Sequence, residues 1–490
     1  MITAELEFPN YSLLPYEKRF AIGELMNLLK ARDVRVGAKT VTAKIPQNKL
    51  QDAYLLTYFR TLSINGKCTT LLQSSNEGTG GRQSTRYSTH GLHEYKGKFN
   101  PQTARHLIAN LVPEDLPILD PFCGSGTTLV EAAHLGRIAE GWDMNPFAVH
   151  LANTKIKTLR LDPIEIEDNT DELVQSLKSK WSLPNTLDAR LEYLLKWFRP
   201  QELCFFEELR EKVGLFPKTK DFFLTIGSDL LRDYSQQEPG DLRIRRRHSP
   251  MPNENPKEVF LKRVQKEVLK LKRQHLSILK AQGKQNAYLV DSRKGRGSAD
   301  LFGGAITSPP YFVALPYIDT QRLSLVWLGL SSPSEIRKLE ASITGSREFR
   351  NSEERETHRK VENGVYLKWP KELRVAYDEL VSRTEETSAG FRTQAMPALF
   401  ARFFTDMAQT FNTVKSVVRR GGRFALVVGQ NNVGKGHNTY AINTPELLAL
   451  VGESQGWGIQ EIIALDAYNR FSIHSKNSVK VEKLVILRRR

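Results

Sequence analysis

Hydrophobic positions in the middle of the chain alternate between short apolar runs and amphipathic stretches. The run "LPILD" (116–120) is typical of a short buried strand, and "LVEAAHLG" (129–136) has the spacing of a helix that ends at a glycine. The run "RIAEGWD" (137–143) predicts the next strand. A strand, a turn, a helix and a second strand in this order predict the opening of a doubly wound α/β sheet.

The same rhythm returns after a long interruption. The runs "AYLVDSR" (287–293) and "GAITSPPY" (304–311) predict two further strands. Three later runs predict a central strand and two closing strands: "RFALVVG" (423–429), "IQEIIALD" (459–466) and "VEKLVILRRR" (481–490). We therefore expect one α/β domain whose strands are separated by insertions.

Three segments depart from this α/β pattern. Apolar residues at helical spacing in 15–33 and 51–64 predict that residues 1–88 form a small helical segment. Residues 157–285 are charged and helical in pattern, and include a strongly basic amphipathic stretch at 257–282. Residues 331–400 are again polar and helical in pattern.

The charge of the chain favours a polyanionic partner. Its 490 residues carry 71 Lys and Arg against 55 Asp and Glu, a formal net charge of +16. Such a balance raises the expectation of nucleic-acid binding. We expect a cytoplasmic protein, because no apolar run approaches the ~18 residues of a membrane span and the start lacks the pattern of a secretory signal. The three cysteines have no C-x-x-C spacing, so we predict no metal site.

A glycine turn follows the first strand of the α/β domain. In "DPFCGSGTT" (120–128), Gly124 and Gly126 permit a tight turn that brings the backbone and a helix N-terminus close to a ligand. A dinucleotide fingerprint would need a third glycine where Leu129 stands. Ordinary strand-to-loop turns remain the alternative interpretation of this stretch.

Two acidic strand ends complement the turn. Asp143 ends the second strand about 20 positions downstream, where a carboxylate can accept both hydroxyls of a ribose. Asp291 ends the next strand and could accept a hydrogen bond from an adenine amino group. The combination suits an adenosine ligand without a pyrophosphate.

The corner Ser308-Pro309-Pro310-Tyr311 follows the fourth strand. Proline restricts its own φ and the residue before it, so the backbone carbonyls take fixed directions. The Ser308 hydroxyl is a further acceptor, and Tyr311 offers a flat face. Fixed acceptors beside an aromatic ring suit a planar base with an exocyclic amino group, whose nitrogen becomes nucleophilic when its hydrogens are held.

These stretches resemble S-adenosylmethionine-dependent DNA amino-methyltransferases, the family that methylates cytosine N4 or adenine N6. "DPFCGSGTT" is similar to the family's cofactor loop, "TSPPY" to its catalytic corner, and "HGLHEYKGKFNP" (90–101) to the segment ahead of the cofactor loop. The resemblance covers roughly 89–156, 286–330 and 400–490. It implies a class I, Rossmann-like methyltransferase fold with a mixed seven-stranded sheet. It also implies the cofactor S-adenosylmethionine and a duplex DNA substrate with a flipped base.

The resemblance assigns roles to particular positions. It implies that the base is held by Ser308, Pro309, Pro310 and Tyr311. It implies that the cofactor is surrounded by Lys98, Phe99, Asp120, Pro121, Phe122, Gly124, Ser125, Gly126, Thr127, Asp143, Met144, Asp291 and Ser292. Serine ahead of Pro-Pro-Tyr is typical of the cytosine-N4 branch and Asp or Asn of adenine enzymes, so we expect cytosine N4, with adenine N6 as the alternative.

The resemblance also gives the segments functional boundaries. The expected order is an N-terminal helical segment (1–88), a cofactor-binding part (89–156), a helical basic insertion (157–285), a catalytic part (286–330), a second insertion (331–400) and a C-terminal part of the methyltransferase domain (401–490). We expect the first insertion to contact DNA through Arg243, Arg245, Arg246 and Arg247, and the second insertion to be a further candidate DNA contact. A nucleoid-associated enzyme of a restriction–modification or phage-defence system, with a cognate endonuclease or defence subunits as partners, fits this interpretation.

Other classes of protein fit the same residues less well. "VVGQNNVGKGH" (427–437) has P-loop spacing, but Gly436 stands where a magnesium-binding hydroxyl is needed. A cytosine-C5 enzyme would need a Pro-Cys pair, which is absent from the sequence. A non-catalytic DNA-binding protein leaves the turn and the corner unexplained. An RNA or protein amino-methyltransferase shares the chemistry of the corner.

Overall fold

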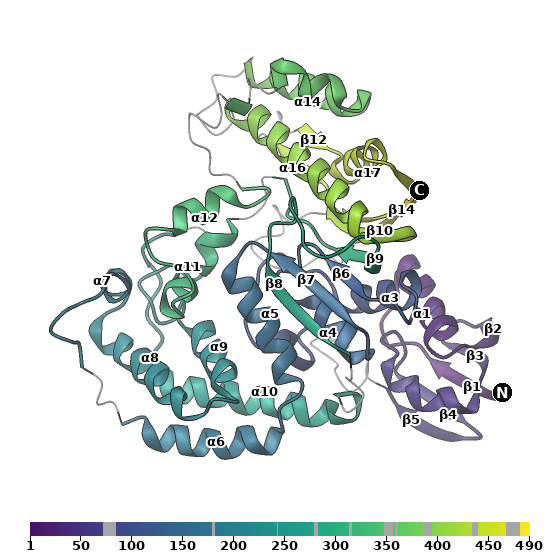
Figure 1. Ribbon diagram of the computed structural model, residues 1–490. Coiled ribbons are helices and arrows are strands. Elements are labelled where there is room, and N and C mark those ends of the chain that lie inside the picture. Colours follow the sequence, from purple (N-terminus) through teal and green to yellow (C-terminus); the bar gives the residue numbers. More distant parts are fainter. Residues whose placement is uncertain are drawn as a thin grey trace.

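The computed structural model describes eleven stretches of the chain: 1–71, 85–178, 182–242, 244–278, 283–312, 316–346, 356–357, 361–385, 394–433, 440–466 and 481–490. Figure 1 shows a central sheet with helices around it and two outlying groups of elements. The N-terminal elements lie against one side of the sheet, and a group of helices extends from the opposite side.

The central sheet has seven strands in the order β13-β14-β10-β9-β6-β7-β8. β14 is antiparallel to both of its neighbours, and β10, β9, β6, β7 and β8 run parallel. This mixed sheet confirms the predicted class I, Rossmann-like fold, including the two closing strands. Its strands are β6 (Ile118–Asp120), β7 (Ala139–Asp143), β8 (Gln285–Leu289), β9 (Phe302–Thr307), β10 (Val418–Gly429), β13 (Trp457–Asp466) and β14 (Val481–Arg489).

The strand order places a ligand crevice at the centre of the sheet. From β6 the chain adds β7 and β8 on one side, and then adds β9 and β10 on the other. In open α/β sheets, ligands bind at the carboxyl ends of the strands where the order reverses. The crevice is therefore expected where the chain leaves β6 and β9.

Helices bury both faces of this sheet. Successive strand residues point to opposite faces, so Ile118 joins the apolar cluster of α3 while Leu119 joins that of α16. Asn100 accepts from the backbone of Gln102 to cap α3. The covering helices are α3 (Pro101–Leu111), α4 (Thr127–His134), α5 (Pro146–Thr158), α16 (Met396–Val417) and α17 (Thr444–Ser454).

Residues 1–71 correct the prediction of a helical N-terminal segment. They form a five-stranded antiparallel sheet in the order β2-β3-β1-β4-β5, with one long helix packed on it. The expected helix at 51–64 is divided between a 3₁₀ helix and β4, since its apolar residues fill a sheet core rather than one helix face. The elements are β1 (Ile2–Glu7), α1 (Pro15–Leu28), β2 (Arg32–Val36), β3 (Thr40–Ile45), η1 (Gln47–Leu55), β4 (Thr61–Ile64) and β5 (Lys67–Thr70).

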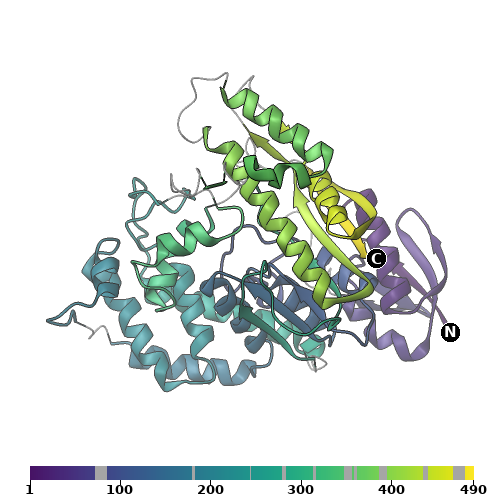
Figure 2. The ribbon, with the colours of Figure 1, turned by 45° about the horizontal axis from the view of Figure 1, so that its top comes forward.

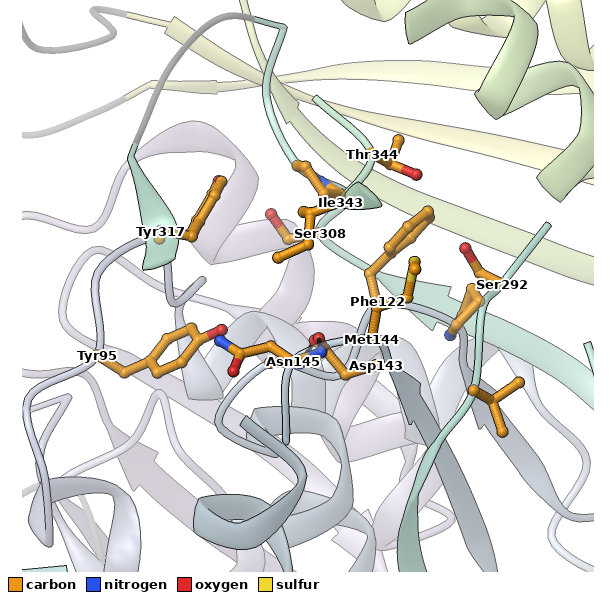
Figure 3. A pocket seen from close by; sticks show the side chains of 15 residues that line it. Tyr95, Phe122, Asp143, Met144, Asn145, Ser292, Ser308, Tyr317, Ile343 and Thr344 are labelled. Carbon is orange, nitrogen blue, oxygen red and sulfur yellow. Dashed lines mark hydrogen bonds between the residues drawn. The ribbon is translucent and has the colours of Figure 1, made fainter. Parts of the chain in front are cut away.

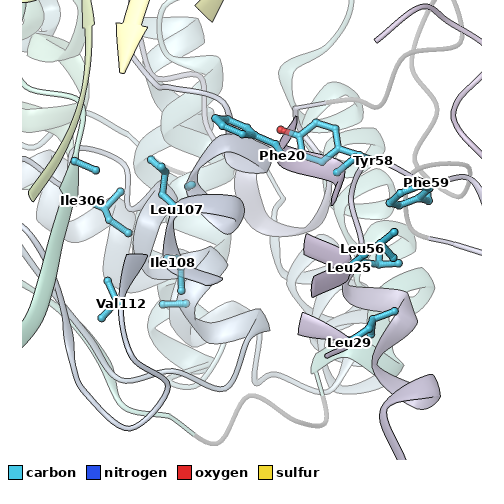
Figure 4. Packing of buried hydrophobic residues seen from close by; sticks show 14 of the residues in the cluster. Phe20, Leu25, Leu29, Leu56, Tyr58, Phe59, Leu107, Ile108, Val112 and Ile306 are labelled. Carbon is cyan, nitrogen blue, oxygen red and sulfur yellow. The ribbon is translucent and has the colours of Figure 1, made fainter. Parts of the chain in front are cut away.

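This N-terminal unit shares a core with the central sheet. In Figure 4, Phe20 and Tyr58 of the unit lie on one side and Leu107, Ile108 and Ile306 on the other, and all belong to one apolar cluster. The Phe20 ring stacks on His106 of α3 with centroids 3.7 Å apart. The N-terminal unit therefore packs directly against α3.

The first insertion is helical, as predicted. Its helices enclose a separate apolar cluster that includes Phe206, Phe223 and Trp327. They are α6 (Pro163–Ser176), α7 (Ala189–Leu195), α8 (Pro200–Lys212), α9 (Lys220–Leu230) and α10 (Pro256–Ile278), and the cluster also takes in residues of α11 (Tyr317–Trp327) and α12 (Ile336–Ser342).

The described part of the second insertion contains α12 and α14 (Lys371–Glu385). Figure 2 shows α14 beside α16, on the side of the molecule opposite the first insertion. The shorter elements are η3 (Ser88–Gly91), η4 (Val213–Leu215), η5 (Val361–Val365), η6 (Tyr366–Lys368), β11 (Asn431–Val433) and β12 (Tyr440–Ile442). In the described part of the chain, every helix is too short or too polar to cross a membrane.

Candidate active site

A cavity opens at the carboxyl ends of β6, β7, β8 and β9. Figure 3 shows Asp143, Met144 and Asn145 on one side of it and Ile343 and Thr344 on the other. Its lining comes from six separate parts of the sequence: Tyr95, Gly97, Pro121, Phe122, Gly124, Asp143, Met144, Asn145, Val290, Ser292, Ser308, Pro310, Tyr317, Ile343 and Thr344.

The glycine turn forms the floor of the cavity. Gly124 has φ +48°, and a Cβ there would lie 3.2 Å from the ring of Tyr95. Gly126 has φ +80°, and its Cβ would lie 2.8 Å from the Cβ of Ala152. Both positions favour glycine because φ is positive. At Gly124 a side chain would also crowd the Tyr95 ring, and at Gly126 it would disturb the packing of α4 on α5.

Asp143 places a carboxylate beside this turn. Its Oδ2 accepts from the Gly124 N–H at 2.9 Å and its Oδ1 from the Asn145 N–H at 2.8 Å. Burial raises the pKa of Asp143 to about 6, although these backbone hydrogen bonds oppose the shift. The carboxylate is thus fixed in position and retains lone pairs for a ligand.

Asp120 connects the turn to the corner instead of lining the cavity. Its Oδ1 accepts from the Thr307 hydroxyl at 2.6 Å and from the Phe122 N–H at 3.2 Å. The side chain is buried, and burial raises its pKa to about 6. The ends of β6 and β9 are therefore held together directly ahead of the two loops that form the site.

The corner is only partly exposed to the cavity. Ser308 and Pro310 line it, whereas Pro309 is buried. The Tyr311 hydroxyl donates to Glu482 Oε1 of β14 at 2.8 Å, and Tyr311 is not among the lining residues. Glu482 of the antiparallel strand β14 thus fixes the position of the Tyr311 side chain.

The end of β8 is arranged differently from the expectation. Asp291 does not line the cavity, because Arg293 binds its carboxylate with Nε at 2.8 Å and Nη2 at 3.0 Å. The neighbours Val290 and Ser292 line the cavity instead. The carboxylate proposed for an adenine amino group is thus engaged by an arginine.

The segment ahead of the glycine turn contributes through residues other than those expected. Gly97 and Tyr95 line the cavity, while Phe99 is buried in the core shared with the N-terminal unit. Lys98 donates to the Thr85 and His90 carbonyls at 2.9 and 3.4 Å, and burial lowers its pKa to about 8. Lys98 and Phe99 therefore stabilise the conformation of the segment without lining the cavity.

A buried ion-pair network anchors this same segment to α4. Glu131 accepts from the Tyr87 hydroxyl at 2.6 Å and lies 2.7 Å from His90 Nε2. Its other oxygen accepts from Arg105 Nε at 2.5 Å, and Arg105 also donates to the Leu55 carbonyl at 2.9 Å. The segment that carries Tyr95 is consequently fixed to α3, α4 and the N-terminal unit together.

The remaining expected residues divide between cavity and core. Pro121, Phe122 and Met144 line the cavity. Ser125 and Thr127 are buried at the start of α4 and lie outside the lining. The lining residues that sequence reasoning missed are Tyr95, Gly97, Asn145, Val290, Tyr317, Ile343 and Thr344. The first four lie within or beside recognised stretches, whereas the last three carry no local signal.

The arginines expected to bind DNA are placed in different environments. Arg243 lies outside the described residues. Arg245 is exposed and pairs with Asp241 at 3.0 Å, and Arg246 lies over the Trp197 ring with its Cζ 4.7 Å from the centroid. Arg247 donates to backbone carbonyls, including those of Ser235 at 2.8 Å and Asp233 at 2.6 Å. Arg247 therefore holds the loop in shape.

The P-loop interpretation and metal binding are the remaining points that the sequence raised. Lys435, on which the P-loop interpretation depends, lies outside the described residues. Among the residues that the structure describes, no group of three or more His, Cys, Asp or Glu side chains is placed to hold a metal ion.

Part of the chain matches known DNA methylases. A family model described as DNA methylase, of the N6/N4 methyltransferase type, matches residues 45–154. The chain is 24% identical over 295 residues to the type II methyltransferase M.MvaI of Kocuria varians, covering 55% of this chain and 64% of that protein. It is 41% identical over 68 residues to the type II methyltransferase M.MjaII of Methanocaldococcus jannaschii, covering 14% and 13%. The chain thus spans less than two thirds of each relative.

Two solved methyltransferase structures align with most of this chain, at low similarity. An S-adenosylmethionine-dependent methyltransferase of Methanosarcina mazei has a TM-score of 0.29 at 10% identity, covering 78% of this chain and 96% of that one. An rRNA methyltransferase of Streptomyces viridochromogenes has a TM-score of 0.30 at 12% identity, covering 85% and 93%. Because both scores are low, the assignment of the fold rests on the strand order.

Proposed function

We propose that this chain is an S-adenosylmethionine-dependent DNA methyltransferase that methylates the exocyclic N4 amino group of cytosine in duplex DNA. The observation that carries the proposal is that a single cavity is lined both by the glycine turn with Asp143 and by Ser308 and Pro310 of the corner. The match to the DNA methylase model and the similarity to two type II methyltransferases support DNA as the substrate.

The lining of the cavity suits S-adenosylmethionine. The two Asp143 oxygens each accept one backbone N–H and retain acceptor capacity for the two ribose hydroxyls. Phe122, Met144 and Ile343 offer apolar surfaces for a flat adenine. When bound, the cofactor supplies an electrophilic methyl group on a sulfonium.

The corner would make a poor nucleophile reactive. The lone pair of an exocyclic amine is delocalised into its ring, so the nitrogen must pyramidalise before it attacks. In the proposed mechanism the Ser308 hydroxyl and a carbonyl of the proline-fixed backbone accept the two amine hydrogens. Because Asp120 and Thr307 fix the end of β9, these acceptors are positioned before the base arrives.

Tyr311 would stack on the base once it has left the helix. The amino group of a paired cytosine lies within the base stack, so the base has to be flipped into the site. The hydrogen bond to Glu482 restrains the rotation of the Tyr311 side chain. A restrained aromatic ring loses little conformational freedom on binding, and base–aromatic stacking is typically worth about 1–3 kcal/mol.

Serine at position 308 favours cytosine N4 over adenine N6, where the related enzymes carry Asp or Asn. A modification enzyme that acts beside a cognate restriction endonuclease or a defence complex is the setting that we propose, since both curated relatives are type II methyltransferases.

The proposal is tested by combined binding and transfer measurements. Titration calorimetry should detect S-adenosylmethionine binding to the wild type, and Asp143→Ala should weaken it by at least about tenfold, the scale of a charge-assisted hydrogen bond. Labelled methyl should then transfer to duplex DNA in preference to RNA or protein. A folded chain that binds DNA but does not bind S-adenosylmethionine would refute the enzymatic assignment.

A further inference from the structure

A short segment of the second insertion, residues 342–346, lies against the cavity, and we call it the strap. Ile343 and Thr344 line the cavity from the side opposite Asp143 (Figure 3). The Ser346 N–H donates to the Ile343 carbonyl at 3.1 Å, and Gly345 between them has φ +76°. A four-residue turn with positive φ at its third position has a defined shape, so the strap contains a tight turn of fixed conformation.

Two arginines hold the strap at its ends. Arg293 Nη2 donates to the Ser342 carbonyl at 3.0 Å, and Arg402 of α16 donates to the Ser346 carbonyl. Arg293 is itself fixed by the Asp291 carboxylate and by Asp406 at 3.1 Å. The arginine that engages Asp291 therefore connects the end of β8 to the second insertion.

The first anchor also locates the strap along the cavity. Arg293 Nη2 lies 3.5 Å from the sulfur of Met144, the residue that directly follows Asp143. Arg293 thus connects the beginning of the strap with the opposite side of the cavity, where the proposed function puts the ribose. Ile343 is the apolar residue that the strap presents to the cavity.

Thr344 lines the cavity and carries a buried hydroxyl group. The residue is 2% exposed, and its hydroxyl has no hydrogen-bond partner among the described residues. Leaving a buried hydroxyl unsatisfied costs about 1–3 kcal/mol. Several described residues carry such a hydroxyl, Thr225 of α9 among them, and Thr344 is the one of these that lines the cavity. A hydroxyl left unpaired in the lining of a ligand cavity is explained if the ligand supplies its partner.

Gly345 brings the strap against the catalytic corner. A Cβ at this position would lie 3.1 Å from the Cβ of Pro310 and 3.2 Å from the carbonyl oxygen of Tyr311. Both distances are shorter than ordinary van der Waals contact, so glycine permits the approach. The strap therefore touches both the proposed cofactor site and the corner.

We propose that the strap is a working part of the active site, in which the Thr344 hydroxyl hydrogen-bonds the adenosine end of the bound cofactor and Gly345 sets the position of the Pro310 corner. The inference rests on the proposed function, and it assigns the second insertion a role inside the site, beyond contact with DNA. Thr344 is a binding residue in this account, and Gly345 a positioning residue.

Thr344→Val tests the binding role, because valine keeps the shape and removes only the hydroxyl. We expect the dissociation constant of S-adenosylmethionine to rise about three- to tenfold, the scale of one hydrogen bond. The melting temperature of the ligand-free variant should be unchanged or higher, since an unpaired buried hydroxyl is lost. The matched control is Thr225→Val of α9, whose hydroxyl is also buried and unpaired among the described residues but outside the cavity.

Gly345→Ala tests the positioning role. We expect the rate of methyl transfer in single-turnover measurements to fall by roughly tenfold or more, since small displacements of reacting groups are costly, while cofactor affinity stays within about twofold. Gly66→Ala is the control, because Gly66 has φ +78° with no atom near the added Cβ. It carries the same backbone strain without touching the site.

The outcomes separate this inference from the proposed function. If the wild type fails to bind S-adenosylmethionine, the proposed function fails. If the wild type binds it, and Thr344→Val binds equally well while Gly345→Ala transfers methyl groups as fast as Gly66→Ala, the strap has no role in the site. Equal losses of affinity in Thr344→Val and Thr225→Val would overturn the binding role alone.

Discussion

Asp143 combines a fixed position with a raised pKa of about 6, and this gives cofactor binding a pH dependence. The ribose hydroxyls need the carboxylate, so protonation competes with the ligand. We expect affinity for S-adenosylmethionine to be full above pH 7 and to fall as the pH drops through about 6, approaching tenfold per pH unit at the acid side. Calorimetry between pH 5 and 8 measures this.

Asp143→Asn provides the control for that pH dependence. It should bind more weakly at pH 8 and show a flatter profile, because the titrating group is gone. If the profile keeps its shape, the titrating group is another one, and Asp120, with a pKa also near 6, becomes the candidate.

Ser308 should affect chemistry rather than cofactor binding. Ser308→Ala removes an acceptor for the amine hydrogens while leaving Asp143 and the glycine turn intact. We expect single-turnover transfer to slow by about 10²–10³, the cost of losing one positioned polar group, with the cofactor dissociation constant within about twofold. A matching loss of affinity would mean that Ser308 contacts the cofactor instead.

The sequence was informative about single residues wherever a recognisable stretch contains them. Gly124, Asp143 and Ser308 were predicted because each follows a strand within a familiar pattern, and all three line the cavity. Asp291 was assigned a free carboxylate because nothing in the sequence reveals that Arg293 folds back on it. Thr344 could not be predicted, since the second insertion brings it to the cavity by tertiary packing.

At the scale of elements, the glycine turn depends on close packing between α4 and α5. Gly126→Ala should lower the stability more than Gly66→Ala, although the two glycines have nearly the same φ, +80° and +78°. The shared backbone strain costs about 1–2 kcal/mol. Only Gly126 adds a contact of 2.8 Å with Ala152, worth about 1–3 kcal/mol more. Denaturant unfolding of both variants compares these costs, and equal losses would contradict the packing argument.

Elements were predictable where their apolar pattern was long or continuous. The buried parallel strands and the helices of the first insertion were recognised from such runs. The N-terminal sheet was missed because its strands are short, although β3 has the alternation of buried and exposed positions that is typical of a strand. The apolar residues of 51–64 imitate helical spacing but divide between η1 and β4, a choice made by strand pairing with β1.

At the scale of the whole molecule, a net charge of +16 does not by itself locate a DNA surface. Several basic residues of α10 are engaged: Arg263 pairs with Asp229, Lys270 with Glu267 at 2.6 Å, and Lys272 with Glu167 at 2.6 Å. The basic character of α10 in the sequence is therefore partly balanced by neighbouring acidic side chains.

Two variants test the DNA surface: one replaces Arg245 and Arg246 together, and the other replaces Arg247. Replacing Arg245 and Arg246 with alanine should flatten the slope of log affinity against log salt by about 0.9 for each DNA phosphate that the variant no longer neutralises. Arg247→Ala should lower the melting temperature more than Arg246→Ala, since Arg247 holds four backbone carbonyls and Arg246 holds that of Lys196. An unchanged slope in a folded double variant would direct the search for the DNA surface to the second insertion.

The central claim is that the cavity transfers a methyl group to an exocyclic amine of DNA, and the identity of the methylated nucleoside tests it most directly. Duplex DNA is incubated with the full chain and methyl-labelled S-adenosylmethionine, digested to nucleosides and analysed by mass spectrometry. The account predicts labelled 4-methylcytosine. Labelled 6-methyladenine alone would overturn the choice of base but keep the chemistry of the corner. Labelled 5-methylcytosine, or no labelled nucleoside from a folded chain that binds the cofactor, would contradict the account.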